Sequence, residues 1–367
     1  MDQLKEYRDN IDSIDQEILN AFLKRLKVVQ KIVEVKKEKG LPIFDEKRER
    51  EVIKNRMNLL PSNENNELVE KLFYTIMDLS KAYQWEEIES IPKEDLKIGY
   101  LGEKGSFSYI AAKKCFKDSK LESYHSFEEI FKSVQDGNVE KAILPIENTS
   151  TGSIIEVYDL LKKYHMQIVG EKNIEINHFL LTKPGVKLEA IEKVYSHPQA
   201  LSQSKDFLKN YNWQLINSEN TSSSALMVHE SKEKNIAAIA SLEAAKLYDL
   251  EVLKDNINYN EKNITRFIII SKRKEHIEKA DKITIGFSVA HEPGALYDVL
   301  GIFQRSGVNL YKLESRPIIN SPFEYYFYAD LAGNIEENEI QKVLEKVRDK
   351  SLSMKIYGNY KRDHRRF

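Results

Sequence analysis

The first forty residues carry apolar side chains at helical spacing, with no glycine or proline between Leu4 and Lys39. This periodicity predicts one continuous helix over residues 4–39, ended by Gly40 and Pro42. At 1.5 Å per residue the helix would be about 54 Å long. Two shorter helices, expected over residues 45–60 and 66–89, cannot cover its apolar face alone, so we expect interlocked helices of a dimer. That face comprises Ile11, Ile14, Ile18, Phe22, Leu26, Val29, Ile32 and Val33.

The pattern changes after an acidic segment at residues 86–95, which we interpret as a linker. Short apolar runs then alternate with helical ones up to about residue 272, which is typical of an α/β fold. A second charged linker over residues 272–282 precedes strand, helix, two strands, helix and strand. This βαββαβ order is ferredoxin-like. The expected ranges are 282–290, 294–306, 308–316, 323–332, 336–350 and 352–360.

Composition narrows the class of protein. A chain of 367 residues with 41% apolar residues is expected to form two or three globular domains. A net charge of −2 argues against general binding to nucleic acid or to an anionic membrane. The sequence contains no apolar run long enough to span a membrane and no secretory apolar segment at its start, so we expect a cytoplasmic protein. Cys115 is the single cysteine, which excludes an internal disulfide.

Cations dominate the candidate chemistry of the helical region. Arg25 and Lys36 are eleven residues apart, close to three full turns, and therefore lie on nearly one face of the long helix. Arg8 points about 100° away from Arg25, toward a different surface such as that of a partner chain. Further polar groups at helical spacing are Asp45, Arg48, Glu49, Ser80 and Gln84. Inward-facing cations are costly unless anions meet them, so this pattern fits either a small dicarboxylate site or ordinary surface charges.

Four polar clusters stand at the ends of predicted strands or the starts of predicted helices. They are residues 147–152 (ENTSTG), 196–203 (SHPQALSQ), 220–224 (NTSSS) and 263–267 (NITRF). Such positions in open α/β sheets form anion-binding mouths, although each cluster alone also fits capping and turn chemistry. His178 and His197 have no second ligand at a useful spacing, so we expect no metal, and no cofactor is expected either.

The helical region resembles the all-helical chorismate mutase family over residues 1–90. The resemblance implies an all-α, intertwined dimer in which Arg8 of one subunit, Arg25 and Arg48 hold substrate carboxylates. It further implies that Lys36 and Gln84 address the ether oxygen. Asp45, Glu49 and Ser80 match the remaining site positions of the family.

Residues 96–272 resemble the prephenate dehydratase family through the motifs GSFSYIAA, ENTSTGS, SHPQALSQ and TRF. The resemblance implies a two-lobed α/β fold with its site between the lobes. Thr265 would then be the essential residue that protonates the leaving hydroxyl, and Arg266 would anchor a carboxylate. The matching functional positions are Asn148, Ser196, Gln203, Thr265, Arg266 and Phe267.

Residues 282–361 resemble an ACT regulatory domain. The resemblance implies that L-phenylalanine binds here at a subunit interface and inhibits the dehydratase. The motif residues are Gly294, Ala295, Leu296, Glu314, Ser315 and Arg316, with Asn309 as a further candidate. We therefore expect a bifunctional enzyme that acts on chorismate and then on prephenate, as a homodimer, with tetramers left open.

Three other hypotheses about the function remain for comparison. A mutase can be fused to a prephenate dehydrogenase, but residues 99–105 read G-x-x-G-x-x-G rather than the dinucleotide fingerprint. The α/β region could be a solute-binding module without catalysis, against which the intact TRF motif argues. A nucleic-acid regulator built on the basic stretch 24–39 disagrees with the overall charge.

Overall fold

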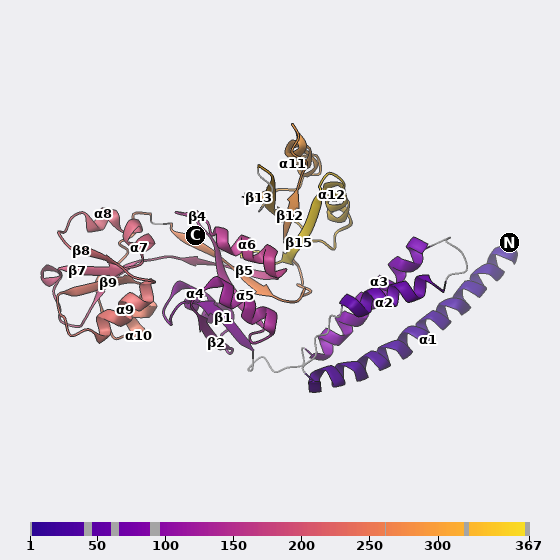
Figure 1. Ribbon diagram of the computed structural model, residues 1–367, viewed down its shortest axis with the longest axis horizontal. Coiled ribbons are helices and arrows are strands. Elements are labelled where there is room, and N and C mark those ends of the chain that lie inside the picture. Colours follow the sequence, from indigo (N-terminus) through magenta and orange to yellow (C-terminus); the bar gives the residue numbers. More distant parts are fainter. Residues whose placement is uncertain are drawn as a thin grey trace. The chain divides into compact units, whose positions relative to one another are not determined.

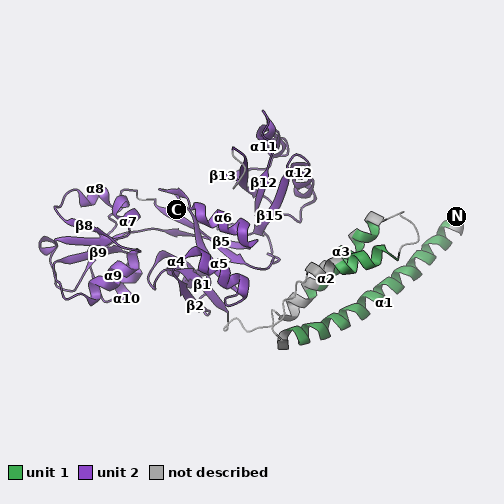
Figure 2. Ribbon diagram, in the orientation of Figure 1, with its two compact units in different colours: residues 1–93 green, residues 94–367 purple. Residues whose placement is uncertain are grey.

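The computed structural model describes residues 2–39, 46–59, 66–88, 96–260, 262–318 and 323–363 (Figure 1). The chain forms two compact units, residues 1–93 and residues 94–367 (Figure 2). We call the first the helical unit. The boundary between the units falls within the linker that the sequence predicts over residues 86–95.

The helical unit contains α1 (Asp2–Lys39), α2 (Glu46–Met57) and α3 (Asn66–Ile88). The three expected helices are confirmed, and their ends differ from the predicted ones by at most three residues. Among the side chains that the structure describes in this unit, few large apolar ones are buried, namely Val29, Val33, Ile53 and Met77. Many others on α1 and α3 are exposed, including Ile11, Ile14, Ile18, Leu19, Leu23, Ile32, Leu68, Leu72 and Leu79. The unit therefore leaves much of its predicted apolar face uncovered.

The second unit begins with a lobe that we call lobe 1. Its strands are β1 (Lys97–Leu101), β2 (Lys120–Tyr124), β3 (Lys141–Asn148), β4 (Gly152–Ser153), β5 (Gln167–Glu175) and β11 (Ile264–Ser271). β1 is parallel to β2 and β3, and β11 runs antiparallel between β3 and β5. The helices are α4 (Phe107–Cys115), α5 (Phe127–Asp136) and α6 (Ile155–Tyr164).

Lobe 2 is inserted between β5 and β11 and has its own sheet, in the order β10-β6-β9-β7-β8. The chain therefore passes between the lobes twice (Figure 1). The strands are β6 (Phe179–Thr182), β7 (Lys193–Ser196), β8 (Gln214–Asn217), β9 (Ile236–Ala240) and β10 (Glu251–Lys254). The helices are α7 (Pro198–Gln203), α8 (Lys205–Leu208), α9 (Thr221–Glu230), α10 (Leu242–Leu247) and the 3-10 turn η2 (Leu188–Ala190).

The C-terminal region has the predicted βαββαβ order. It consists of β12 (Lys282–Ser288), α11 (Ala295–Arg305), β13 (Leu310–Pro317), β14 (Tyr325–Ala332), α12 (Asn338–Asp349) and β15 (Ser353–Tyr360). The strands pair in the order β13-β14-β12-β15. Alternate residues of β12, such as Ile285 and Phe287, form a core with Val299 and Phe303 of α11. The opposite face of this sheet carries Tyr326 and Tyr328, which belong to the core of lobe 1.

The C-terminal region and lobe 1 share one continuous sheet. Gly358 of β15 pairs with Ile168 of β5, which joins the two sets of strands into a ten-stranded sheet. A Cβ atom on Gly358 would lie 2.2 Å from the carbonyl oxygen of Ile168, so this approach requires glycine. Tyr158 of α6 and Tyr328 of β14 pack with ring centroids 4.9 Å apart. The expected linker at residues 272–282 therefore does not separate two independent bodies.

Candidate functional site

Arg25 is the central cation of the helical unit. Its guanidinium, on α1, donates hydrogen bonds to the hydroxyl of Ser80 and, at 3.4 Å, to the carbonyl of Ile76, both on α3. Ser80 in turn donates to the same carbonyl over 2.6 Å. Partial burial lowers the pKa of Arg25. No acidic side chain in the described part of the chain forms an ion pair with Arg25.

The other predicted residues of this unit are described only in part. Arg8 is exposed on α1, and Lys36 is half-buried near the end of the same helix. Arg48 is exposed on α2 and pairs with Glu51 over 3.4 Å. Asp45 lies outside the described residues, as do the side chains of Glu49 and Gln84. In the described part of the unit, the predicted residues Arg25 and Ser80 are in direct contact.

In the second unit, polar side chains meet where the chain passes between the lobes. Asn148, the last residue of β3, donates from Nδ2 to Oγ1 of Thr265 over 2.9 Å and to Oδ1 of Asn263 over 2.8 Å. The carbonyl oxygen of the same side chain accepts from the backbone amides of Ser150 and Thr151. Asn148 is thus held on both sides, and its amide fixes the position of the Thr265 hydroxyl.

Lobe 2 contributes Gln203 from the end of α7. Its Oε1 accepts from Nδ2 of Asn263 over 3.0 Å and from Nε2 of His178 over 2.8 Å. Burial lowers the pKa of His178 to about 4, so the ring is neutral at neutral pH and donates from Nε2. We call Asn148, Gln203, Asn263 and Thr265 the amide cluster; all four side chains are buried.

Direct hydrogen bonds also tie the rims of the two lobes. Gln199 on α7 donates to Oγ1 of Thr151 over 2.8 Å. Ser241 and Tyr248 of lobe 2 donate to the carbonyls of Gly105 and Lys104, over 2.7 and 3.0 Å. The loop at residues 102–105, which superficially suggests a nucleotide site, therefore packs against lobe 2.

Two of the predicted positions in lobes 1 and 2 lie in the interior of a lobe. Ser196 is fully buried, and its hydroxyl donates to the carbonyl of Ile239 over 2.7 Å, tying β7 to β9. Phe267 is buried in the apolar core of lobe 1 with Tyr100 and Ile143. The strand positions that these two side chains occupy face the interior of a lobe, and neither side chain contacts the amide cluster through a hydrogen bond that the structure gives.

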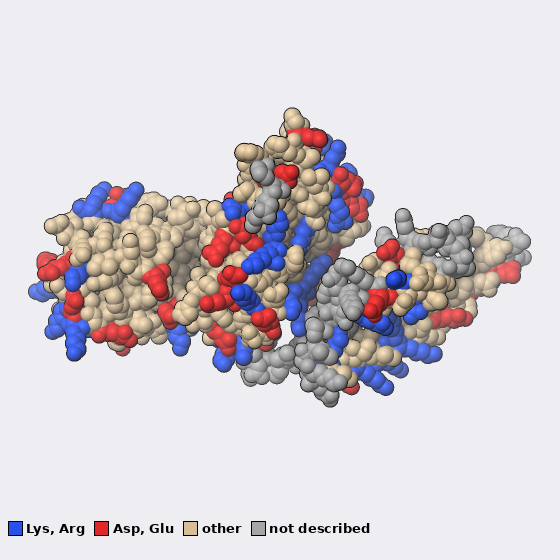
Figure 3. All heavy atoms as spheres, viewed as in Figure 1, with Lys and Arg blue, Asp and Glu red and all other residues tan. Residues whose placement is uncertain are grey.

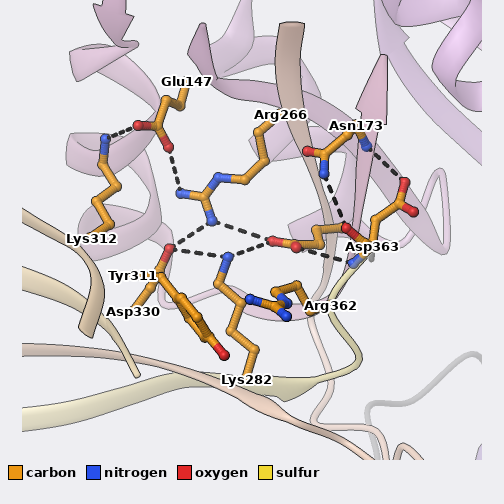
Figure 4. A pocket seen from close by; sticks show the side chains of 10 residues that line it. Glu147, Asn173, Arg266, Lys282, Tyr311, Lys312, Asp330, Arg362 and Asp363 are labelled. Carbon is orange, nitrogen blue, oxygen red and sulfur yellow. Dashed lines mark hydrogen bonds and ion pairs between the residues drawn. The ribbon is translucent and has the colours of Figure 1, made fainter. Parts of the chain in front are cut away.

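Arg266 is the position expected to anchor a substrate carboxylate. Adjacent residues of a strand point to opposite faces, so Arg266 points away from the side of Thr265. Its guanidinium pairs with Asp330 at 2.6 Å, Glu147 at 3.2 Å and Glu171 at 3.3 Å (Figure 4). Burial opposes its charge, but Asp330 and the neighbouring groups raise the pKa of Arg266. Carboxylates of the protein itself therefore satisfy this cation.

The predicted residues of the C-terminal region divide between two faces of its sheet. Gly294 caps α11 in a left-handed conformation, followed by the partly buried Ala295 and Leu296. Ser315 is exposed on β13, and Asn309 is exposed just before that strand. Glu314 and Arg316 point instead to lobe 1, where Glu314 accepts from Ser153. Arg316 forms two hydrogen bonds to the carboxylate of Asp159, at 2.9 and 3.2 Å. Strand alternation thus keeps the seven residues from forming one cluster within a single chain.

Sequence reasoning did not single out Asn263 or His178 as members of a site. Asn263 stood inside a polar cluster, and only its contacts with Asn148 and Gln203 identify it as the link between them. His178 is isolated in the sequence, twenty-five residues before Gln203. No local signal could have joined these positions.

Acidic and basic side chains are interspersed over the visible face of the chain (Figure 3), which fits the net charge of −2. Within the described residues, no group of three or more His, Cys, Asp or Glu side chains is arranged to hold a metal ion. No helix in the described part of the chain is both long and apolar enough to cross a membrane.

Comparisons with known proteins identify the helical unit and the two lobes of the second unit. Residues 7–85 match the chorismate mutase type II family, and residues 98–275 match the prephenate dehydratase family. The bifunctional chorismate mutase/prephenate dehydratase of Buchnera aphidicola is 35% identical over 366 residues, which cover 96% of this chain and 95% of that protein.

Solved structures resemble the second unit. A prephenate dehydratase from Arthrobacter aurescens, in complex with L-Phe, has a TM-score of 0.67 and 27% identity, over 73% of this chain and 90% of that one. GqqA, described as a quorum quenching acylase, has a TM-score of 0.68 and 30% identity, over 73% of this chain and 98% of that one. The two family matches and the near full-length relative agree on one assignment: the chain belongs to the bifunctional chorismate mutase/prephenate dehydratase family.

Proposed function

We propose that the helical unit converts chorismate to prephenate around Arg25, and that the amide cluster converts prephenate to phenylpyruvate with Thr265 as proton donor. We also propose that L-phenylalanine inhibits the second reaction through the C-terminal region, which then acts as an ACT sensor. The two reactions would thus be consecutive steps of phenylalanine biosynthesis. The observation that carries the dehydratase assignment is the hydrogen bond from Asn148 to Thr265.

The mutase reaction is a unimolecular rearrangement and requires no nucleophile. Its substrate must be held in a compact conformation, and its ether oxygen must receive donors as negative charge develops there. Arg25 supports this role because it is half-buried and because, among the described residues, its hydrogen-bond partners are uncharged groups of Ile76 and Ser80. In the proposed site Arg25 and Arg48 hold carboxylates, and Lys36 and Gln84 address the ether oxygen. Asp45, Glu49 and Ser80 orient the ring hydroxyl and the cations.

The dehydratase reaction breaks two bonds of prephenate. The electron pair of the bond to the ring carboxylate enters the ring as CO₂ leaves, and the ring hydroxyl departs with its own bonding pair. Protonation converts that hydroxyl to water, and the ring becomes aromatic. The Thr265 hydroxyl accepts from Asn148, and the described residues offer no acceptor for its hydrogen, so that hydrogen can be donated to the leaving group. Solvent would return a proton to Thr265 after each turnover.

A homodimer is proposed because the helical unit leaves its apolar face exposed. Ile11, Ile14 and Ile18 follow one another along α1 and are each more than half exposed. A contiguous apolar face of this kind marks a protein interface. In the proposed dimer, a second copy covers this face and contributes Arg8 to the site around Arg25.

The sensor proposal draws on the L-Phe complex of the Arthrobacter aurescens dehydratase and on the start of α11. The amides of Ala295 and Leu296 stand at this helix N-terminus, where a carboxylate is favoured. Asn309 and Ser315 are exposed on the neighbouring edge of the sheet. Glu314 and Arg316 face lobe 1, so in this proposal they link β13 to lobe 1, and a second copy would complete the binding site.

One experiment tests the whole proposal. Purified protein is given chorismate, and prephenate and phenylpyruvate are followed with and without phenylalanine; an acyl amide serves as a control for the activity named for GqqA. We expect prephenate to appear first, phenylpyruvate to follow, and phenylalanine to slow only the second step. Failure to consume added prephenate would refute the dehydratase site, and insensitivity to phenylalanine would refute the sensor.

A further inference from the structure

β3 and β11 present two different surfaces at their paired ends. Asn148 stands opposite Thr265 in the ladder, and Glu147 stands opposite Arg266. Successive side chains of a strand point to opposite faces. Asn148 and Thr265 therefore share the face of the amide cluster, whereas Glu147 and Arg266 share the face toward the C-terminal region. Each residue of the proposed catalytic pair is joined through the backbone to a charged neighbour on the far side.

These charged neighbours belong to a chain of alternating charges between lobe 1 and the C-terminal region (Figure 4). Lys312 of β13 lies 2.9 Å from Glu147, and Glu147 lies 3.2 Å from Arg266. Arg266 lies 2.6 Å from Asp330 of β14, which lies 3.4 Å from Lys282 of β12. Two strands of the C-terminal region, β13 and β14, thus contact the two residues that flank the catalytic pair, and Lys282 of β12 supports Asp330.

The cavity beside this chain of charges is about 520 Å³ and is lined by four acidic and four basic side chains. These charges balance in number, and six of them pair with one another, so the cavity offers no excess charge to attract a charged ligand; the six are Glu147, Glu171, Arg266, Lys282, Lys312 and Asp330. The side chains of Arg266, Asp330 and Lys282 keep at most 11% of their surface exposed. Low exposure strengthens such pairs and makes their geometry definite. The arrangement therefore suits passing a shift in the strands of the C-terminal region on to lobe 1, rather than binding a substrate.

We propose that Glu147 and Arg266 are positioning residues, which hold Asn148 and Thr265 in register, and that Lys312 and Asp330 of the C-terminal region act on the dehydratase site through them. The proposal rests on Thr265 as the catalytic residue and on the sensor role of the C-terminal region. A shift of β13 or β14 on binding phenylalanine would move Glu147 or Arg266, and with it the hydroxyl of Thr265. No contact between phenylalanine and the amide cluster is required.

The first test separates positioning from substrate binding. Arg266→Met and Arg266→Lys are compared in the full-length protein with prephenate as substrate. Positioning predicts that Arg266→Met lowers kcat at least thirtyfold with KM within threefold of the wild-type value, and that Arg266→Lys restores most of kcat. A tenfold rise of KM with kcat retained would overturn the proposal, because that is the behaviour of an anchor for a substrate carboxylate.

The second test addresses the link to the sensor. Asp330→Asn removes one charge while Glu147 and Glu171 still pair with Arg266. We expect kcat within threefold of wild type and a shift of at least fivefold in the phenylalanine concentration for half-inhibition, the range of typical allosteric coupling. Glu275→Gln is the matched control: it removes an ion pair with Lys141, which lies at the other end of β3 from Asn148, and it touches no residue of the C-terminal region. Its inhibition curve should match that of the wild type.

Lys312→Met probes the same chain of charges from its other end and serves if Asp330→Asn melts far below the wild type. Folded Asp330→Asn or Lys312→Met enzyme with wild-type inhibition would overturn the link. A wild-type enzyme that phenylalanine does not inhibit would refute the sensor proposal instead, and the kcat and KM of the Arg266 variants would still decide the positioning role.

Discussion

Asn148 and Thr265 are joined side chain to side chain, over 2.9 Å, across the ladder between β3 and β11. The amide of Asn148 is the donor, since its own carbonyl oxygen already accepts from the backbone of Ser150 and Thr151. The threonine oxygen is therefore the acceptor, and the hydrogen of the hydroxyl is left to point elsewhere. This orientation makes a weak acid useful for donating a proton at one defined position.

Thr265→Val tests this arrangement because it replaces the hydroxyl by a methyl group of similar size. We expect dehydratase kcat to fall by about 10²–10⁴-fold, the usual contribution of a positioned acid, with mutase kcat unchanged. Thr265→Ser, which keeps the hydroxyl, should retain a substantial part of the rate. Phenylpyruvate formation is measured spectrophotometrically, and a Thr265→Val enzyme within a few-fold of wild type would remove Thr265 from the mechanism.

Sequence reasoning located Thr265 and Arg266 together but could not assign them to different faces. As long as the strand register is unknown, two adjacent residues of one motif are both assigned to the same site. The pairing of β11 with β3 separates them, and Asp330, sixty-four residues later, explains the charge on Arg266. Asp330 lies on β14, and no local pattern in the sequence connects that strand with β11.

Arg25→Ala should lower mutase kcat by about 10²–10³-fold, as removal of one electrostatic donor does in other active sites. Dehydratase turnover of added prephenate should stay at the wild-type level, because Arg25 and Thr265 belong to different compact units. Arg25→Lys keeps the charge but loses the planar guanidinium with its several N–H donors, so an intermediate rate is expected. Equal loss of both activities in Arg25→Ala would argue against separate sites.

His178 should make lobe 2 less stable in mild acid. Burial lowers its pKa to about 4 from an ordinary value of 6.5, so the unfolded chain binds a proton that the folded lobe rejects. The stabilisation is complete above pH 6.5 and is lost as the pH falls toward 4. Between pH 7.5 and pH 5 it should amount to about 2 kcal/mol.

The Trp85→Phe variant is compared with the double variant that also carries His178→Gln. Removing Trp85 leaves Trp213 of lobe 2 as the fluorescent reporter of unfolding. Urea unfolding at the two pH values should show a larger loss of stability for the histidine form. Identical losses in the two proteins would mean that His178 does not titrate across this range.

The helices and strands were largely predictable, because apolar spacing alone distinguishes the helical unit from the α/β region. The contacts of Gln203 with Asn263 and His178 were not predictable. The fold brings these three residues together only where the chain passes between the lobes. The predicted dimer had a physical basis in the sequence. A helix as long as α1 cannot bury Ile14 within its own unit, and Ile14 is indeed exposed.

Ile14→Glu tests the interface by placing a charge on this apolar face. We expect mutase kcat to fall at least tenfold, because loss of the second copy would also remove its Arg8 from the site. Gln16→Glu adds the same charge about 200° around α1 and should leave the rate unchanged. Sedimentation of both variants shows whether assembly changes, and a fully active Ile14→Glu mutase would refute the shared site.

Gly294→Ala tests the sensor through the backbone at the start of α11. Gly294 has φ = +88° and no neighbouring atom within 4 Å of an added Cβ, so the methyl group meets no clash and its cost of about 1–2 kcal/mol is conformational. Turning the N-terminal amides of α11 away from a bound carboxylate should raise the phenylalanine concentration for half-inhibition at least fivefold. Gly307→Ala, with φ = +65° and equally open surroundings at the other end of this helix, should leave inhibition unchanged. Equal shifts in both variants would assign the effect to general loosening of α11 and count against a phenylalanine site at its N-terminus.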